Sequence, residues 1–140
     1  MKNLEIYIHI PFCVRKCEYC DFLSFPADDD AKLRYVKGLM AEMIFYGPLM
    51  KNYQVSSVYI GGGTPSSIDE QWIAALMEGV FDCFNVLPDA EISIECNPGT
   101  LSREKLLAYR DAGINRLSIG LQSANNDAVS YTHLTLPTNY

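Results

Sequence analysis

Three cysteines near the start of the chain have the spacing of ligands to a single metal centre. Cys13, Cys17 and Cys20 follow a C-x3-C-x2-C pattern, whereas Cys83 and Cys96 stand alone. Thiolates this close in sequence can all face one soft metal. A structural zinc site usually takes four protein ligands, and the sequence offers no obvious fourth. A four-iron cluster on three cysteines keeps one iron open for a ligand. The spacing therefore favours an iron–sulfur cluster, with zinc or redox thiols as alternatives.

The segments around these cysteines alternate between predicted strands and predicted helices. Runs of β-branched and aromatic residues indicate the strands, and apolar residues at helical spacing indicate the helices. Ser67 and Glu70 form a capping box for the second helix, and Thr100 or Ser102 caps the third, which Gly113 ends. This alternation predicts an α/β fold with about four parallel strands and three helices. The predicted strands cover residues 4–10, 55–60, 90–95 and 115–120, and the predicted helices cover about 31–46, 67–84 and 100–113.

Residues suited to chemistry follow the end of each predicted strand. Cys13 comes after the first strand, the segment 61–64 (GGGT) after the second, Glu95 ends the third and Gln122 follows the fourth. In parallel α/β folds, binding sites gather at the carboxyl ends of the strands. We therefore expect these residues to form a single site at one edge of the sheet.

The composition restricts the classes of partner. The 140 residues include 17 acidic and 11 basic side chains, which gives a formal net charge of −6. A nucleic-acid or anionic-membrane surface requires a basic patch, so neither partner is expected. The sequence contains no apolar run approaching the ~20 residues of a bilayer span and no signal-peptide pattern at its start. We expect a cytoplasmic protein.

Four segments carry motifs in a recognisable order. They are residues 7–22 with the three cysteines, 61–66 (GGGTPS), 94–100 (IECNPGT) and 115–123 (NRLSIGLQS). Together they resemble the radical S-adenosylmethionine (SAM) superfamily, and within it the branch similar to oxygen-independent coproporphyrinogen III oxidase. The resemblance implies that the chain is the N-terminal portion of a (β/α)6 partial TIM barrel.

One position separates two groups within that branch. The oxidases resemble C-x3-C-x2-C-x-C, whereas this chain has Phe22 in the place of the fourth cysteine. Residues 19–22 resemble instead the HemW-type heme chaperones, a family that binds and transfers heme. We therefore expect a heme chaperone. The alternatives are an oxygen-independent coproporphyrinogen III oxidase (dehydrogenase) of porphyrin biosynthesis and, from another class, a structural zinc-binding module. Whether the chain is an enzyme stays open at this point.

The resemblance also implies roles for individual residues. Cys13, Cys17 and Cys20 would hold a [4Fe–4S] cluster whose open iron binds SAM. The glycine segment would contact the amino and carboxylate end of SAM, and Glu95 its ribose hydroxyls or ammonium group, unless Glu95 is a solvated strand-end carboxylate. His9 is interpreted as a hydrogen-bonded core histidine in preference to a metal or heme ligand. The expected SAM-binding residues are Tyr7, Tyr19, Gly62, Gly63, Thr64, Glu95 and Gln122.

The implied partners are heme or a porphyrinogen, and an electron donor such as a flavodoxin or ferredoxin. Membrane proteins that accept heme are further partners of the family, and the residue that binds heme is expected outside this sequence. The last residues, 129–140, resemble the translated read-through of a sequencing adapter. We therefore expect a truncated radical SAM core domain at 1–128 followed by a non-native tail. A genuine but divergent C-terminus is the alternative.

Overall fold

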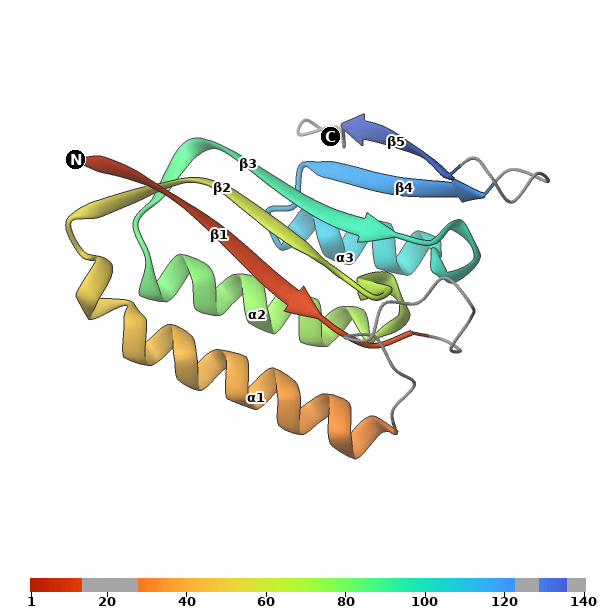
Figure 1. Cartoon of the computed structure of the whole chain (residues 1–140), viewed down its shortest axis with the longest axis horizontal. Coiled ribbons are helices and arrows are strands. Elements are labelled where there is room, and N and C mark those ends of the chain that lie inside the picture. Colours follow the sequence, from red (N-terminus) through yellow and green to blue (C-terminus); the bar gives the residue numbers. More distant parts are fainter. Residues whose placement is uncertain (14–27, 123–128, 136–140) are drawn as a thin grey trace.

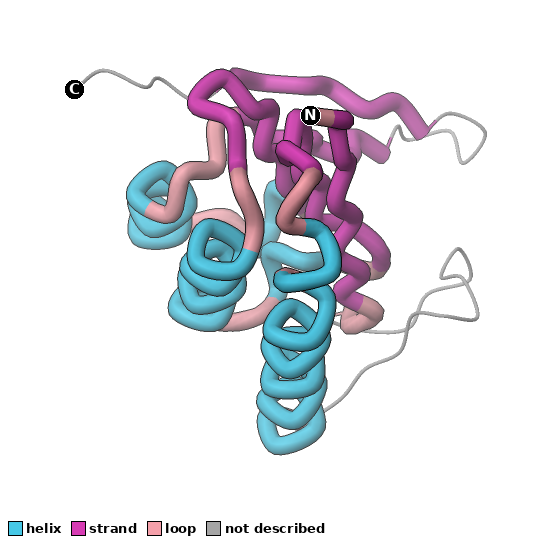
Figure 2. The backbone as a smooth tube through the Cα atoms, turned by 90° about the vertical axis from the view of Figure 1, so that its left-hand side faces the viewer, coloured by secondary structure: helices cyan, strands magenta, loops and turns pink. Residues whose placement is uncertain are grey.

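A single sheet with helices on one side organises the chain. The structure is a computed structural model that describes residues 1–13, 28–122 and 129–135, with side chains described up to residue 119. The sheet has the strand order β1-β2-β3-β4-β5, and the helices α1, α2 and α3 all cover the same face (Figures 1 and 2). The elements are β1 (Lys2–Ile10), α1 (Asp29–Tyr46), β2 (Tyr53–Gly62), α2 (Glu70–Cys83), β3 (Val86–Cys96), α3 (Arg103–Asp111), β4 (Arg116–Gln122) and β5 (Val129–Thr135), with short 3-10 turns at Pro48–Met50, Pro65–Ser67 and Pro98–Thr100.

The first four strands are parallel, which confirms the predicted α/β arrangement of four parallel strands and three helices. Their carboxyl ends lie at one edge of the sheet, toward the arrowheads of β1 and β3 in Figure 1. The fifth strand, β5, was not predicted, and it pairs antiparallel with β4. It falls within the segment that resembles an adapter read-through. The non-native origin of residues 129–140 and the domain boundary at residue 128 stay predictions.

The core lies between the sheet and the helices. Alternate residues of the strands point toward the helices, as the period of two in a strand requires. Ile8, Ile60 and Ile94 are at most 3% exposed. None of the helices in the described part of the chain has both the length and the apolar character that a bilayer span requires. The buried residues that α1, α2 and α3 contribute include Val36, Met43, Ile73, Leu76, Met77, Val80 and Tyr109.

Short polar side chains start the helices, although one of them is not the predicted residue. Asp28 caps α1 by accepting a hydrogen bond from the Ala31 N–H at 2.8 Å. The predicted capping box of the second helix is wrong. Asp69 caps α2 by accepting from the Gln71 N–H at 2.8 Å, while Ser67 belongs to the preceding 3-10 turn. Asp69 immediately precedes the first helical residue, so its carboxylate is the side chain in reach of the unpaired N–H groups there.

Candidate functional site

The face of the sheet that the described helices leave uncovered carries polar side chains. Tyr7 and His9 lie on β1, Tyr59 on β2, Glu95 on β3 and Ser118 on β4, and we call these five residues the polar face. Strand register places Tyr7 beside Tyr59 and Glu95 beside Ser118. Two of the residues predicted to bind SAM, Tyr7 and Glu95, therefore share one surface near the carboxyl ends of the strands.

Tyr59 connects the two predicted residues of the polar face. Its hydroxyl donates a hydrogen bond to Glu95 Oε1 at 2.9 Å, and its ring stacks on that of Tyr7 with 6.2 Å between the centroids. Burial raises the pKa of Tyr59, and the neighbouring Glu95 raises it further, whereas a hydrogen bond with Ser118 lowers it. The net effect is upward, so the phenol stays protonated at neutral pH and acts as the donor.

His9 extends this row of side chains toward the end of β1. Its Nδ1 lies 3.1 Å from the Tyr7 hydroxyl, whereas its buried Nε2 has no hydrogen-bond partner among the described residues. His9 is therefore hydrogen-bonded through one ring nitrogen, as interpreted, but it is half-buried on the polar face and does not belong to the core. The imidazole also lies against Gly62, where a Cβ atom would come within 2.9 Å of it.

The glycine segment predicted to hold the amino and carboxylate end of SAM packs directly against the chain that enters the cysteine motif. Gly62 has a φ of +119°, a conformation that only glycine adopts without strain. The Thr64 N–H donates to the Phe12 carbonyl at 2.7 Å. A Cβ atom on Gly63 would lie 2.5 Å from that carbonyl oxygen and 3.1 Å from Cys13 Sγ. A side chain at Gly63 would therefore collide with the very residues that lead to the first predicted ligand.

Ser66 joins the loop after β2 to the loop after β3. It is fully buried, and its hydroxyl accepts a hydrogen bond from the Asn97 N–H at 3.0 Å and contacts the Thr100 hydroxyl. The Lys105 ammonium donates to the Ser66 carbonyl. These contacts hold the end of the glycine segment beside the end of β3, where Glu95 lies. From the sequence, Ser66 had no predicted role and Thr100 was a candidate cap of the third helix, a place that Ser102 takes in the structure.

The described residues fit a group held by the Cys13 thiol beside the glycine segment. Cys13 is 6% exposed, and backbone without side chains lies beside its thiol. Cys17, Cys20 and Tyr19 lie outside the described residues. The described ranges contain no group of three possible metal ligands, and they include only one of the three predicted cysteines. Gln122 was predicted to follow the fourth strand, but it is the last residue of β4, and its side chain lies outside the described part of the structure.

Two isolated cysteines differ from the clustered ones. Cys96 is buried in the core, and burial is the main cause that raises the pKa of its thiol to about 12, with a smaller opposing effect of Lys105. Cys83 lies in the second helix as predicted, where it is the last residue of α2, and it is half-buried. Both lie on the helical side of the sheet.

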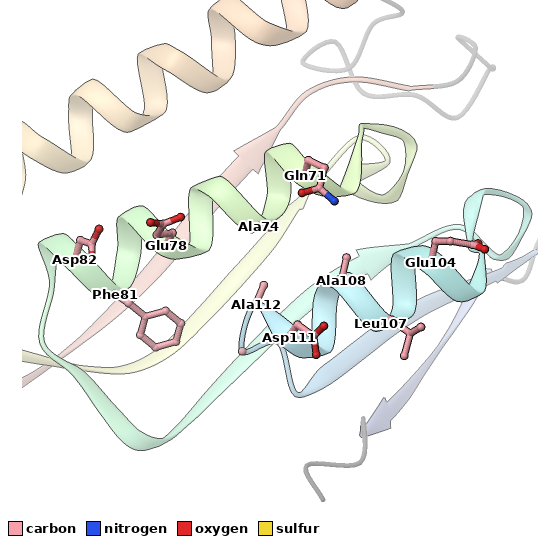
Figure 3. A pocket seen from close by; sticks show the side chains of 11 residues that line it. Gln71, Ala74, Glu78, Phe81, Asp82, Glu104, Leu107, Ala108, Asp111 and Ala112 are labelled. Atoms are coloured by element: carbon pink, nitrogen blue, oxygen red, sulfur yellow. The ribbon is translucent and has the colours of Figure 1, made fainter. Parts of the chain in front are cut away.

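A separate groove between α2 and α3 is not the candidate site. Phe81 and Leu107 are its large apolar residues, and several carboxylates surround them (Figure 3). The groove lies among the helices, on the side of the sheet away from the polar face, and none of the predicted site residues lines it. Its lining residues are Gln71, Ala74, Glu78, Phe81, Asp82, Glu104, Leu107, Ala108, Asp111, Ala112 and Gly113.

Comparison with known proteins identifies the family of the chain. The sequence profile of the Radical SAM superfamily matches residues 7–137. The chain is similar to the heme chaperone HemW of Escherichia coli, with 39% identity over 130 residues that cover 89% of this chain and 33% of the relative. It is similarly related to HemW of Bacillus subtilis, with 38% identity over 122 residues, covering 86% and 32%. The chain thus spans about a third of the length of the curated relatives it matches.

Two further relatives extend the comparison. A bovine protein, the mitochondrial radical S-adenosyl methionine domain-containing protein 1, is 37% identical over 127 residues, which cover 89% of this chain and 28% of the relative. The solved structure of coproporphyrinogen III oxidase (HemN) from Escherichia coli, described as a radical SAM enzyme, matches with a TM-score of 0.80 and 34% identity. That match covers 89% of this chain and 29% of the other. The alternation of strands and helices seen here is therefore shared with a known radical SAM fold.

Proposed function

This chain belongs to the radical SAM superfamily, and we propose that it is the cluster-binding and SAM-binding part of a heme chaperone of the HemW type. The observation that carries the proposal is the packing of the Gly62–Gly63 backbone against Phe12 and Cys13 at the sheet edge where Glu95 also lies. Relatives named as HemW heme chaperones, at 36–39% identity, support the choice within the superfamily.

Three thiolates would anchor the cofactor. We assign Cys13, Cys17 and Cys20 as ligands of a [4Fe–4S] cluster, the cofactor that the superfamily implies. When bound, such a cluster supplies an electron that can cleave the sulfonium carbon–sulfur bond of SAM. The contribution of the chain is to orient the ligand and to keep water away. The buried position of Cys13 under the glycine segment supports this role.

The remaining contacts to SAM would come from the polar face and the glycine segment. Gly62, Gly63 and Thr64 would line the ammonium and carboxylate end of SAM, because a ligand can approach the main chain closely where side chains are absent. The N–H groups of Gly63 and Thr64 already donate to the Ile10 and Phe12 carbonyls, so they hold the segment in place. Glu95 would accept hydrogen bonds from the ribose hydroxyls or the ammonium group. Tyr7, 57% exposed on the polar face, would form a wall of the site. Tyr19 and Gln122 stay predicted contacts.

A second function has a specific observation in its favour. The structural match to coproporphyrinogen III oxidase supports an oxygen-independent oxidase, which would make the chain part of an enzyme. Phe22 favours the chaperone, because a fourth cysteine is expected at that position in the oxidases. Heme or a porphyrinogen as partner, an electron donor and a cytoplasmic location are parts of the same proposal. The described part of the chain supplies no contact from which to name a heme ligand.

Anaerobic reconstitution tests the proposal. The protein is loaded with iron and sulfide under strict exclusion of oxygen, and iron, sulfide and zinc are measured per chain. We expect about four irons per chain, together with saturable binding of SAM in equilibrium dialysis. Stoichiometric zinc without iron would overturn the cluster assignment. Heme titration and an assay of coproporphyrinogen III conversion, run side by side on the natural full-length protein, separate the two functions. Product formation without stable heme binding would establish the oxidase.

A further inference from the structure

We propose that Tyr59 is a positioning residue for Glu95, and that its phenol fixes the carboxylate that receives the donor groups of SAM. This inference rests on the proposed function. The hydrogen bond from the Tyr59 hydroxyl to Glu95 Oε1 at 2.9 Å is its first support. A glutamate side chain has three rotatable bonds, and fixing it at the moment of ligand binding costs free energy. A carboxylate that is already fixed avoids this cost when the ligand arrives.

The surroundings hold the Tyr59 ring as well as its hydroxyl. The Tyr7 ring stacks on it at 6.2 Å with an interplanar angle of 22°. Gly61 follows Tyr59 by two residues in β2 and is buried. A Cβ atom on Gly61 would lie 2.8 Å from Tyr59 Cε1 and 3.0 Å from Glu95 Oε1. Gly61 therefore leaves the space in which the phenol and the carboxylate meet. Neither Tyr59 nor Gly61 had an individual role predicted from the sequence.

This geometry also indicates which ligand groups the site accepts. Tyr59 engages Oε1, which leaves Oε2 as the natural acceptor for a hydroxyl or ammonium donor of the ligand. A ligand without donors at this place would leave a half-buried carboxylate oxygen unpaired, which is unfavourable. Tyr59 thus contributes to specificity through Glu95 without itself contacting SAM.

The test compares Tyr59→Phe with Tyr53→Phe. Both substitutions remove one phenol oxygen from β2, but Tyr53 lies at the opposite end of the strand, half-buried and away from the polar face. Each variant is reconstituted with iron and sulfide, and the dissociation constant for SAM is measured by equilibrium dialysis without a reductant. A hydrogen bond to a charged group supports a loss of about tenfold in affinity for Tyr59→Phe. Tyr53→Phe should stay within about twofold, and iron content should be unchanged in both.

A double-mutant cycle distinguishes positioning from a structural role. In a Glu95→Ala background, Tyr59→Phe should weaken SAM binding by less than about threefold, because the side chain on which it acts has already been removed. A tenfold loss in both backgrounds would overturn the proposal. A second pair of variants tests the same contact without changing Tyr59. Gly61→Ala should weaken SAM binding because it crowds both partners, whereas Gly38→Ala, with no atom within 4 Å of its added Cβ, should not.

Failure of this inference and of the proposed function are distinguishable. If the reconstituted wild-type chain binds SAM and Tyr59→Phe binds it equally well, Tyr59 has no positioning role and the proposed function is unaffected. If the wild-type chain carries its cluster but binds no SAM, the proposed function itself is wrong, and this inference falls with it.

Discussion

The two faces of the same four strands differ in what their side chains do. On the face toward the helices, Ile8, Ile60 and Ile94 are buried aliphatic residues whose contacts have no preferred direction. On the polar face, Tyr7, Tyr59 and Glu95 interact through one hydrogen bond and one ring stack of defined geometry. Ile60 and Tyr59 are neighbours in sequence, yet they belong to different faces. Stability and ligand binding are therefore separated along each strand by the alternation of its side chains.

The largest expected effect concerns the cysteines. Replacing Cys17 with alanine should abolish the cluster, because two remaining thiolates do not hold four irons. Replacing Cys83, at the end of α2 on the helical side, should leave the iron content unchanged. Iron and sulfide are measured after anaerobic reconstitution of both variants. Loss of iron in Cys83→Ala would show that the ligand assignment is wrong.

The next largest effect tests the separation of the two faces directly. Ile60→Ala should reduce the free energy of unfolding by about 2–5 kcal/mol, because it removes a fully buried side chain and leaves a cavity. Tyr59→Phe keeps the ring and loses one partly exposed hydrogen bond, so it should cost no more than about 1.5 kcal/mol. Urea unfolding followed by circular dichroism measures both. Equal losses would mean that the polar face contributes as much to folding as the core does.

An alkaline transition should originate on the helical face. Burial raises the pKa of Cys96 from its ordinary value of 9.0 to about 12 in the folded chain. Below pH 9 the thiol is protonated in both states, and its contribution to stability is complete. As the pH rises from about 9 to 12, the unfolded chain ionises first, so stability falls by at most about 1.4 kcal/mol per pH unit.

Cys96→Ala isolates this contribution. The free energy of unfolding is measured in urea at pH 8, 9 and 10, and the wild type should lose more stability than the variant between pH 9 and 10. Burial also raises the pKa of Tyr109 above its ordinary 10.0, so its contribution, of the same sign, begins only above that window. Identical pH profiles for the two proteins would mean that Cys96 is not the titrating group.

The order of the strands and helices could be predicted from the sequence because each depends on local patterns. Runs of β-branched and aromatic residues predicted the four parallel strands, and helical spacing of apolar residues predicted the three helices. The cap of α2 was predicted wrongly because Ser67, Asp69 and Glu70 all suit a helix start, and only the path of the 3-10 turn decides among them. The strand β5 could not be expected, since its sequence resembles a segment foreign to the fold.

The residues of the candidate site also include some that could be predicted from local patterns and others that could not. The glycine segment and Glu95 were predicted because they belong to linear motifs. Tyr59 was missed because its importance depends on the register between β2 and β3, which brings its hydroxyl to a carboxylate 36 residues away. Ser66 was missed for the same reason, because its partners Asn97 and Thr100 follow a different strand. Contacts between elements are not encoded in any local pattern that a single sequence displays.

The last comparison is between two adjacent serines of the 3-10 turn that follows β2. The Ser66 hydroxyl accepts the Asn97 N–H and contacts Thr100, whereas the buried Ser67 hydroxyl has no hydrogen-bond partner within the described residues. Ser66→Ala removes an acceptor and should cost about 1–2 kcal/mol. Ser67→Ala removes an unpaired buried hydroxyl and should be neutral or slightly stabilising.

Both serine variants are measured by urea unfolding and by SAM affinity, because Ser66 lies between the glycine segment and the end of β3. If these contacts hold the two loops together, Ser66→Ala should weaken SAM binding even under conditions in which the variant is fully folded. A loss of stability alone would not change the affinity under those conditions. Ser67→Ala should leave the affinity unchanged. A loss of stability in Ser66→Ala with unaltered SAM affinity would mean that Ser66 contributes to folding, as the core residues do, and not to ligand binding.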